Sequence, residues 1–340
     1  MRHEQTDLMK GTAISDLPIH YEYRTISQFK GMSPPVVCPT FLELKVVYGC
    51  PYDCEYCYLK GTLAFLSKHG EVPVMPLKNY IKRLQLASRD LEKFFKVVKK
   101  PCLLNAGELG EPLMFENTDL PLSLWLMRAF AKNTVGHKVL ILTKSNSIGK
   151  ITRTLEKIKV HDKDFGDPDK YLVMAFSLTT NYTNKHYEGA PCPAKRLEAA
   201  YELQRLGIPV RIRIDPILPL PNVEEAKQDI RNLVATMATK LALKRIDRIT
   251  LGTPRINNPR LWRLGFWKSD MKQFMHPITL NDGKRIWRIQ RDIRHTLYET
   301  ALTALWDNGY RNAFALCKET ESLWKTLKLD PNHPNCNCVI

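Results

Sequence analysis

Six short runs rich in aliphatic residues alternate along the chain with longer amphipathic stretches. The runs are FLELKVVY at 41–48, CLLNAGE at 102–108, KVLILTK at 138–144, YLVMAFSL at 171–178, VRIRIDPIL at 210–218 and RITLG at 248–252. The stretches at 79–99, 119–132, 147–160, 194–206 and 223–240 are long enough to be crossover helices. Strands that alternate with helices in this way are parallel and have right-handed connections, so the sequence predicts an α/β sheet or barrel.

The two ends of the chain differ from this alternating part. Residues 1–35 are polar and end in Ser33-Pro34-Pro35, which favours a flexible lead-in. From 255 onward the sequence becomes rich in Trp and Arg, then shows a helical pattern near 288–306 and a tail that carries cysteines. We therefore predict a lead-in over 1–35, an α/β unit over 36–254 and a basic extension over 255–340.

Charge and cysteine content narrow the class of protein. The chain has 51 Lys and Arg against 35 Asp and Glu, a net charge of +16, which favours a polyanionic partner. No apolar run approaches the roughly 18 residues of a membrane helix, and the start MRHEQTDLMK has no secretion signal, so we expect a cytoplasmic protein without a membrane partner. Nine cysteines, an odd number, favour metal or redox chemistry over a disulfide framework.

Three of these cysteines, Cys50, Cys54 and Cys57, follow the first predicted strand at the spacing CxxxCxxC. A loop at the carboxyl end of a parallel strand lies on the active face of an α/β array. Structural zinc needs four ligands, whereas three thiolates can hold a cubane [4Fe-4S] cluster and leave one iron open. A zinc knuckle with a distant fourth ligand, or three unrelated buried thiols, are the alternatives.

The CxxxCxxC loop after a first strand, with Tyr56 before the third cysteine, resembles the signature of the radical S-adenosylmethionine (SAM) superfamily. The resemblance implies a partial (β/α)6 radical SAM barrel, with the basic extension following it. It also implies a [4Fe-4S] cluster whose open iron chelates SAM, and reductive cleavage of SAM to methionine and a 5′-deoxyadenosyl radical that abstracts hydrogen from a substrate.

Further motifs resemble the branch of this superfamily that contains spore photoproduct lyase and its relatives. They are Glu188-Gly189-Ala190-Pro191, Arg196-Leu197-Glu198-Ala199-Ala200, Asp215-Pro216-Ile217 and Leu316-Cys317-Lys318-Glu319-Thr320. The resemblance implies that SAM is bound by Gly107, Glu108, Lys144, Ser145, Ser177 and Arg196, and that Tyr56 and Tyr58 relay a hydrogen atom. The residues themselves leave open a solvated loop for Glu108, a surface lysine at 144, a helix cap for Arg196, and cluster packing for the tyrosines.

The sequence departs from the lyase at its hydrogen-donating cysteine. That family carries a thiol just after the second strand, where this chain reads Ala106-Gly107-Glu108. Cys102 begins the strand and should lie at the opposite face of the barrel. Cys192 is predicted on the active side, where it is a candidate replacement donor or an inert loop thiol.

Residues 255–294 combine ten Lys and Arg against three Asp with five interleaved aromatic residues. Cations contact phosphates and aromatic rings stack on unpaired bases, so we predict a nucleic acid partner, DNA more than RNA. A core of aromatics under a solvated charged face is the alternative. Asn281-Asp282-Gly283 fits either a hairpin turn, as the lyase resemblance implies, or a helix start.

The tail cysteines Cys317, Cys336 and Cys338 fit part of a second cluster, a zinc site or no site. The function that the sequence predicts is a radical SAM enzyme resembling spore photoproduct lyase. It would act on a nucleic acid base, in photoproduct repair or base modification, with an electron donor such as flavodoxin or ferredoxin. A nucleic-acid-binding protein with a structural Fe-S or zinc site is the alternative.

Overall fold

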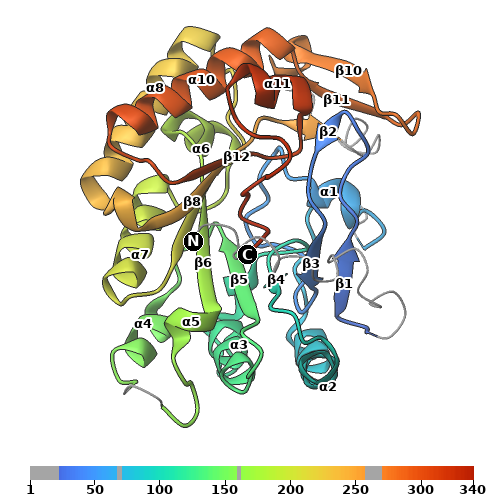
Figure 1. The fold of residues 1–340 in the computed structure, drawn as a ribbon, viewed down its shortest axis with the longest axis vertical. Helices are drawn as coiled ribbons and strands as arrows, with labels where there is room; N and C mark the ends of the chain where they lie inside the picture. The colour runs from blue at the N-terminus through green and yellow to red at the C-terminus, as the bar shows by residue number, and fades with distance from the viewer. Residues whose placement is uncertain (1–22, 67–70, 159–161, 257–269) are drawn as a thin grey trace, which may run out of the picture.

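The computed structural model describes residues 23–66, 71–158, 162–256 and 270–340. Its centre is an eight-stranded sheet in the order β1-β3-β4-β5-β6-β7-β8-β12 (Figure 1). All pairs from β3 to β8 and the β8–β12 pair are parallel, and only the edge strand β1 is antiparallel. The mixed α/β architecture with a mostly parallel sheet confirms the predicted α/β fold class and is consistent with a partial barrel.

Each of the six predicted strands is present, and two more strands join the sheet. The predicted six are β3 (Phe41–Leu44), β4 (Leu103–Asn105), β5 (Lys138–Thr143), β6 (Leu172–Leu178), β7 (Val210–Ile214) and β8 (Ile246–Leu251). The added two are β1 (Ile26–Phe29), which lies within the predicted lead-in, and β12 (Ala313–Leu316), which lies within the predicted extension. The sheet therefore takes strands from all three predicted segments.

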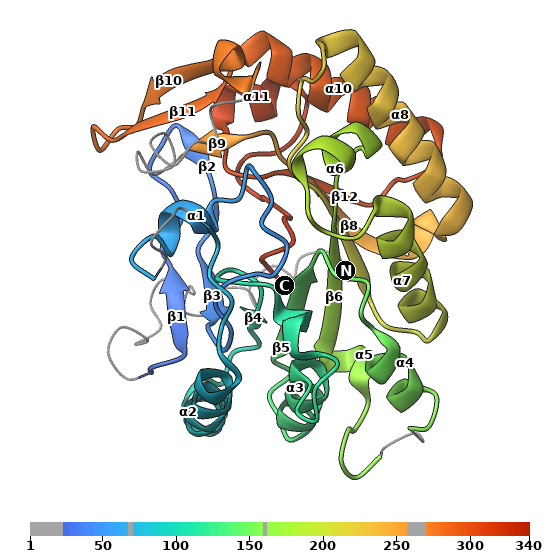
Figure 2. The ribbon, with the colours of Figure 1, turned by 180° about the vertical axis from the view of Figure 1, so that it is seen from behind.

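The longer helices of the chain cover the outer face of the sheet (Figures 1 and 2). The longer ones are α2 (Leu77–Val97), α3 (Leu122–Ala131), α7 (Pro193–Arg205), α8 (Val223–Lys240) and α10 (Arg291–Asp307), and the shorter ones are α1 (Leu59–Thr62), α4 (Gly149–Leu155), α5 (Pro168–Tyr171), α6 (Asn181–Tyr187), α11 (Glu321–Thr326) and the 3-10 turns at Pro112–Phe115, Leu243–Arg245 and Asp270–Phe274. No helix within the described ranges is long and apolar enough to span a membrane.

The two-residue period of the strands separates side chains that pack under the outer helices from side chains on the inner face of the sheet. In β5, Val139 and Ile141 join the main core under the helices, whereas Leu140 belongs to a separate cluster on the inner face. In β7, Ile212 and Ile214 join the main core, so the intervening Arg213 faces inward. The inner face is therefore where polar groups gather at the ends of the strands.

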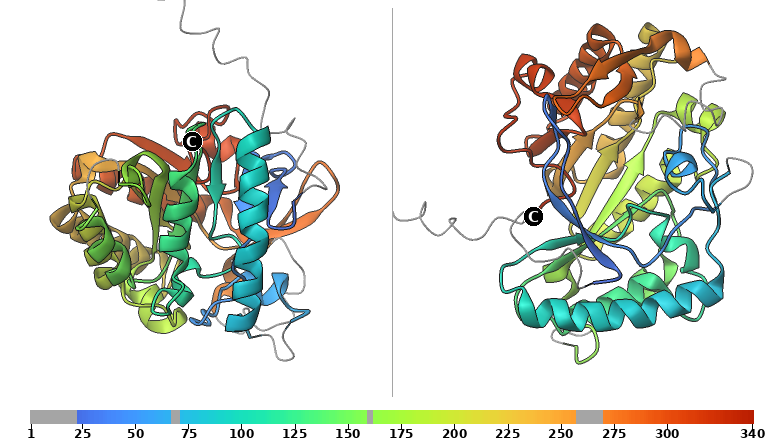
Figure 3. Two further views of the ribbon diagram at one scale, coloured as in Figure 1. Left: turned by 90° about the horizontal axis from the view of Figure 1, so that it is seen from below. Right: turned by 90° about the vertical axis from the view of Figure 1, so that its right-hand side faces the viewer.

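The chain after β8 forms one small sheet, returns to the large sheet as β12 and then contributes to a second small sheet. The hairpin β10 (Met275–Thr279) and β11 (Arg285–Ile289) pairs with β9 (Arg255–Ile256), and β13 (Glu319–Thr320) pairs with β2 (Val36–Val37). Gly283 has a φ of 79° in the hairpin turn, so the structure selects the hairpin over a helix start at this position. The two views of Figure 3 show this part beside the large sheet.

Candidate active site

A cavity of about 380 Å³ lies at the carboxyl ends of the parallel strands, and Cys50, Cys54 and Cys57 line it together. The loop that carries them is fixed by backbone hydrogen bonds from Cys50 to Pro73 (3.0 Å) and from Cys57 to Cys54 (3.1 Å). Gly49 starts the loop with a φ of 84°, and a Cβ there would lie 1.9 Å from the Pro73 oxygen. The close approach explains why the sequence has glycine before the first cysteine.

The three thiols are the donor set that a site-differentiated cluster requires. No fourth cysteine is among the described residues that line this cavity. Burial raises the pKa of each thiol, to about 12 for Cys57, so metal binding there must displace protons. Across the described part of the chain, no three His, Cys, Asp or Glu side chains are already gathered as a complete metal-binding group. The residues fit a three-thiolate cluster, but its presence is not shown.

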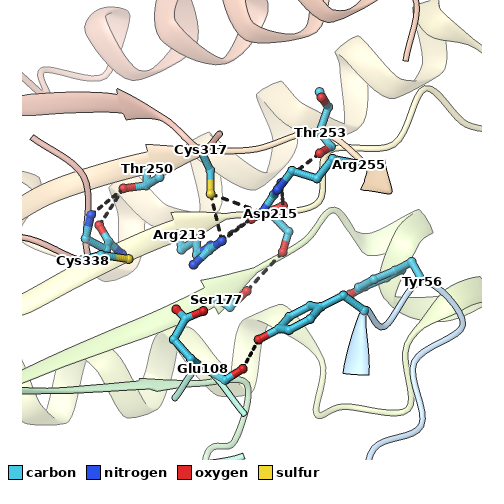
Figure 4. Close-up of polar contacts among 12 residues, drawn as sticks. Tyr56, Glu108, Ser177, Arg213, Asp215, Thr250, Thr253, Arg255, Cys317 and Cys338 are labelled. Atoms are coloured by element: carbon cyan, nitrogen blue, oxygen red, sulfur yellow. Dashed lines mark hydrogen bonds and ion pairs between the residues drawn. The ribbon is translucent and has the colours of Figure 1, made fainter. Parts of the chain in front are cut away.

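The loop after β4 brings a carboxylate to the opposite wall of the cavity. Asn105 donates a hydrogen bond to Glu108 (2.7 Å) and accepts one from the Gly107 backbone (3.0 Å). A Cβ on Gly107 would lie 2.5 Å from the Leu142 oxygen, so a larger residue would push this loop away. The hydroxyl of Tyr58 donates to the Glu108 backbone oxygen (Figure 4). Gly107, Glu108 and Tyr58 thus line the same cavity as the three cysteines.

A second wall is built around the buried carboxylate of Glu188. Lys144 Nζ lies 2.5 Å from Glu188 and 3.1 Å from the hydroxyl of Tyr56, which also donates to Glu188. Burial lowers the pKa of Lys144 to about 7, with the nearby guanidinium of Arg196 acting in the same direction. Lys144 and Tyr56 line the cavity, whereas Glu188 does not. The buried carboxylate of Glu188 therefore holds the polar atoms of both residues at the cavity surface.

Arg196 and Ser145, which were predicted to contact SAM, are not among the residues that line the cavity. Arg196 is fully buried and donates to Glu188, to the Ser177 oxygen (2.7 Å) and to the Pro191 oxygen (2.6 Å). Ser145 is also buried, and its backbone N–H donates to the Thr143 hydroxyl (2.8 Å). Neither residue lines the cavity. Both instead make hydrogen bonds with residues that form or support its wall. Ser177 does line the cavity.

The two other predicted cysteines lie apart from the cavity. Cys192 is exposed at the residue before α7 and does not line the cavity, so the structure does not bring it to the site as a hydrogen donor. Cys102 is buried directly before β4, at the amino end of the strand, as its position in the sequence predicts. A side chain at that end points to the stabilising side of the barrel.

Sequence reasoning did not single out an ion cluster on the inner wall, formed by Arg213, Asp215 and Arg255 (Figure 4). Asp215 lies 2.8 Å from Arg213 and 2.7 Å from Arg255, and all three line the cavity. Although burial raises the pKa of Asp215, Arg255 and Arg213 hold it well below its usual range. The sequence feature that could have indicated this cluster is Arg213, a charged residue in an otherwise buried strand.

The basic stretch is partly internal, which corrects its predicted role as one continuous contact surface. Arg288 and Arg294 are buried beside Glu319, at 3.6 Å and 3.0 Å. Arg255 belongs to the ion cluster described above, while Phe274 and Trp287 pack against a small core. Lys272, Lys284, Arg285 and Arg291 are exposed. The predicted contacts Arg260, Trp262, Arg263, Phe266, Trp267 and Lys268 lie outside the described residues.

The sheet, its outer helices and the cavity at the strand ends form a partial α/β barrel. Solved structures of spore photoproduct lyase have a similar fold. One in complex with dinucleoside spore photoproduct has a TM-score of 0.61 at 15% sequence identity, covering 79% of this chain and 74% of that chain. A mutant with bound AdoMet and dinucleoside spore photoproduct has a TM-score of 0.60 at 14% identity, covering 86% and 79%.

A further lyase mutant has a TM-score of 0.61 at 14% identity and covers 88% of this chain and 80% of that chain. No protein-family model matches the chain. No curated protein sequence matches it either. The likeness at this identity establishes the fold.

Proposed function

We propose that this protein is a radical SAM enzyme that acts on a nucleic acid base. The observation that carries the proposal is the cavity at the strand ends, which has Cys50, Cys54 and Cys57 on one side and Glu108 with Lys144 on the other. Three thiols fit a [4Fe-4S] cluster with one open iron. A carboxylate and an ammonium group beside it match the amine and carboxylate of an amino acid such as the methionine part of SAM.

The residues of the cavity have distinct parts in this proposal. Cys50, Cys54 and Cys57 hold the cluster, Glu108 accepts hydrogen bonds from the amine of SAM, and Lys144 faces its carboxylate. When bound, the cluster and SAM supply the electron transfer and the 5′-deoxyadenosyl radical. Tyr56 and Tyr58 both present hydroxyls at the cavity, Tyr56 toward Glu188 and Tyr58 toward the Glu108 backbone. They are the proposed route for a hydrogen atom.

The proposal is tested by anaerobic reconstitution of the full chain with iron and sulfide, followed by reduction in the presence of SAM. Formation of 5′-deoxyadenosine, measured by chromatography, supports it. A protein that takes up metal yet forms no 5′-deoxyadenosine has a structural Fe-S or zinc site, as in the alternative function. Irradiated DNA, undamaged DNA and RNA are then compared as substrates, with reduced flavodoxin or ferredoxin replacing the chemical reductant.

We expect Glu108→Gln to weaken SAM binding without loss of the cluster. A hydrogen bond to a charged group contributes about 1.5–3 kcal/mol, which corresponds to a roughly 10- to 100-fold rise in the Kd of SAM. Binding is measured by equilibrium dialysis against the reconstituted protein, and the cluster by its visible absorbance. Glu55→Gln is the matched control. Glu55 is an exposed acid on the cysteine loop, and it does not line the cavity. An unchanged Kd in Glu108→Gln would leave Glu108 as a loop residue.

The β10–β11 hairpin is the proposed nucleic acid contact. It carries the exposed Lys284 and Arg285 next to its turn, and Lys272 is exposed directly before β10. The hairpin pairs through β11 with β9, which includes the cavity-lining Arg255. A strand of nucleic acid on this hairpin would therefore lie beside the cavity. The lyase structures contain dinucleoside spore photoproduct, which makes DNA the first candidate.

Replacing Lys272, Lys284 and Arg285 together by Ala should flatten the salt dependence of nucleic acid binding. Each phosphate neutralised adds about 0.9 to the log-log slope on duplex and about 0.7 on single strands, so the loss should be roughly 2–3 units. The slope is measured by fluorescence anisotropy over a range of salt concentrations.

The matched control replaces Lys82, Arg89 and Lys96 by Ala. These three cations are exposed on α2, at the other end of the molecule from the hairpin, and their removal changes the net charge equally (Figure 1). If both triple variants lose the same slope, binding follows net charge and the hairpin has no special role.

A further inference from the structure

A second cavity, of about 30 Å³, adjoins the first and is lined by four cysteines from three distant segments: Cys38, Cys317, Cys336 and Cys338. Glu108, Arg213 and Lys318 line both cavities and form the wall between them. The sequence shows only three neighbouring thiols in the tail. The fourth, Cys38, is brought to them by the fold.

The strand pair β2–β13 joins Cys38 to Cys317. Val37 pairs with Glu319 in antiparallel register, and Cys38 follows β2 directly while Cys317 shortly precedes β13. The backbone N–H of Cys317 donates to the Leu251 oxygen (2.7 Å), at the end of β8. Both thiols therefore stand on backbone that is fixed by a sheet.

The other two thiols flank Asn337, which is clamped to the large sheet. Asn337 is 1% exposed, and its side-chain oxygen and backbone N–H both bond the hydroxyl of Thr250, at 2.9 Å and 3.0 Å. Its amide also donates to the Ile212 oxygen (3.2 Å), and Arg211 donates to its backbone oxygen (2.7 Å). The tail is thus packed against the inner face of the large sheet. Cys336 and Cys338 are held in place because they flank the hydrogen-bonded Asn337.

The four thiols face one small space. Cys336 and Cys338 share a side-chain hydrogen bond. All four cysteines line the same cavity of about 30 Å³, so their side chains surround one shared space.

Cations or a hydrogen-bond donor lie beside two of the four sulfurs, those of Cys317 and Cys338. Arg213 and Arg255 donate to the Cys317 sulfur at 3.0 Å and 3.2 Å (Figure 4). Lys318 lines the same cavity, and Asn105 donates to the Cys338 sulfur at 3.8 Å. Four thiolates around a divalent ion leave two negative charges, and such charge is tolerated inside a protein only beside cations and hydrogen-bond donors.

We propose that Cys38, Cys317, Cys336 and Cys338 bind one zinc ion, each sulfur giving up its proton to solvent as it becomes a ligand. Four thiolates are the commonest purely sulfur set for structural zinc. The cavity of about 30 Å³ is of a size that fits a single ion. As the described side chains stand, no three His, Cys, Asp or Glu are placed to hold a metal ion, so zinc would have to draw the thiols inward by side-chain rotation. The ion would fasten the tail to β2 beside the first cavity.

The test uses the full chain with the first cysteine set removed, as the triple variant Cys50→Ala, Cys54→Ala, Cys57→Ala. Expressed with added zinc, this protein should hold close to one zinc per chain by plasma mass spectrometry. Adding Cys336→Ser and Cys338→Ser should lower the zinc content at least about tenfold. Loading with Co²⁺ in place of zinc should give the thiolate charge-transfer absorbance of a tetrahedral site, and the same two substitutions should remove it.

Two further variants keep the result interpretable. Cys102→Ser and Cys192→Ser, one buried and one exposed cysteine outside the second cavity, should leave zinc content unchanged. If the tail variant fails to fold by circular dichroism, Cys38→Ser replaces it, since Cys38 is half-buried at the end of β2. No zinc in the triple variant, zinc retained without the tail thiols, or iron and sulfide bound in its place would each overturn the proposal. These readouts do not depend on SAM chemistry.

Discussion

Cys54→Ala is expected to abolish SAM cleavage and to remove the [4Fe-4S] absorbance from the reconstituted protein. Cys54 is the central member of the three thiols that line the large cavity, and it is 5% exposed. No described cysteine besides these three lines that cavity, so none is placed to replace Cys54 as a ligand. Iron per chain and 5′-deoxyadenosine formed under reduction are the two measurements. Cys50→Ala and Cys57→Ala should behave alike.

The matched controls are Cys102→Ala and Cys192→Ala, which remove a thiol of equal size outside the cavity. Both should cleave SAM at the parent rate. Cys192→Ala also tests the predicted donor role, because a donor variant would keep SAM cleavage yet lose or misdirect the product. The exposed position of Cys192 leads us to expect an unchanged product. Full SAM cleavage by Cys54→Ala would refute the cluster assignment.

Gly49→Ala is expected to lower the free energy of unfolding by roughly 2–5 kcal/mol and to lower the iron content after reconstitution. The left-handed backbone costs a residue with a Cβ about 1–2 kcal/mol, and overpacking adds about 1–3 kcal/mol. The new Cβ would lie 1.9 Å from the Pro73 oxygen, which itself accepts the hydrogen bond of Cys50. The loop must move, and the first cluster ligand moves with it. Urea unfolding and iron analysis measure the two effects.

Gly207→Ala separates the two causes. Gly207 has a φ of 82°, close to that of Gly49, but nothing lies within 4 Å of the position of its new Cβ. This variant should therefore lose only the about 1–2 kcal/mol of the backbone conformation, and it should reconstitute as the parent does. If Gly49→Ala and Gly207→Ala unfold at the same urea concentration and bind the same iron, the cysteine loop has more freedom than its contacts indicate.

Local patterns in the sequence were sufficient for six of the eight strands of the large sheet and for the cysteine loop. The two-residue alternation in VRIRI at 210–214 reflects the pleat of β7, whose apolar residues join the core while Arg213 faces the cavity. Cys50, Cys54 and Cys57 lie within eight residues, so their convergence depends on one loop. Glu108 and Lys144 follow parallel strands and therefore meet at the same end of the sheet.

The rest depended on which distant segments lie side by side. In the sequence, Arg288 looks like one more cation of a basic surface. In the structure, Arg288 on β11 is buried and forms an ion pair with Glu319 on β13. Arg196 was predicted to contact SAM. In the structure it is a buried residue of α7, and its guanidinium forms an ion pair with Glu188. These outcomes depend on burial, which a periodic pattern does not assign to a single polar residue.

By itself the sequence determined the alternating α/β architecture and the three-thiol loop, because both arise from residues close together in the chain. Only the tertiary structure decided that Cys38 lies with Cys317, Cys336 and Cys338, and that Cys192 stands apart from the cavity. The physical reason is that strand pairing and the clamp on Asn337 join positions nearly 300 residues apart, and no local spacing records that contact.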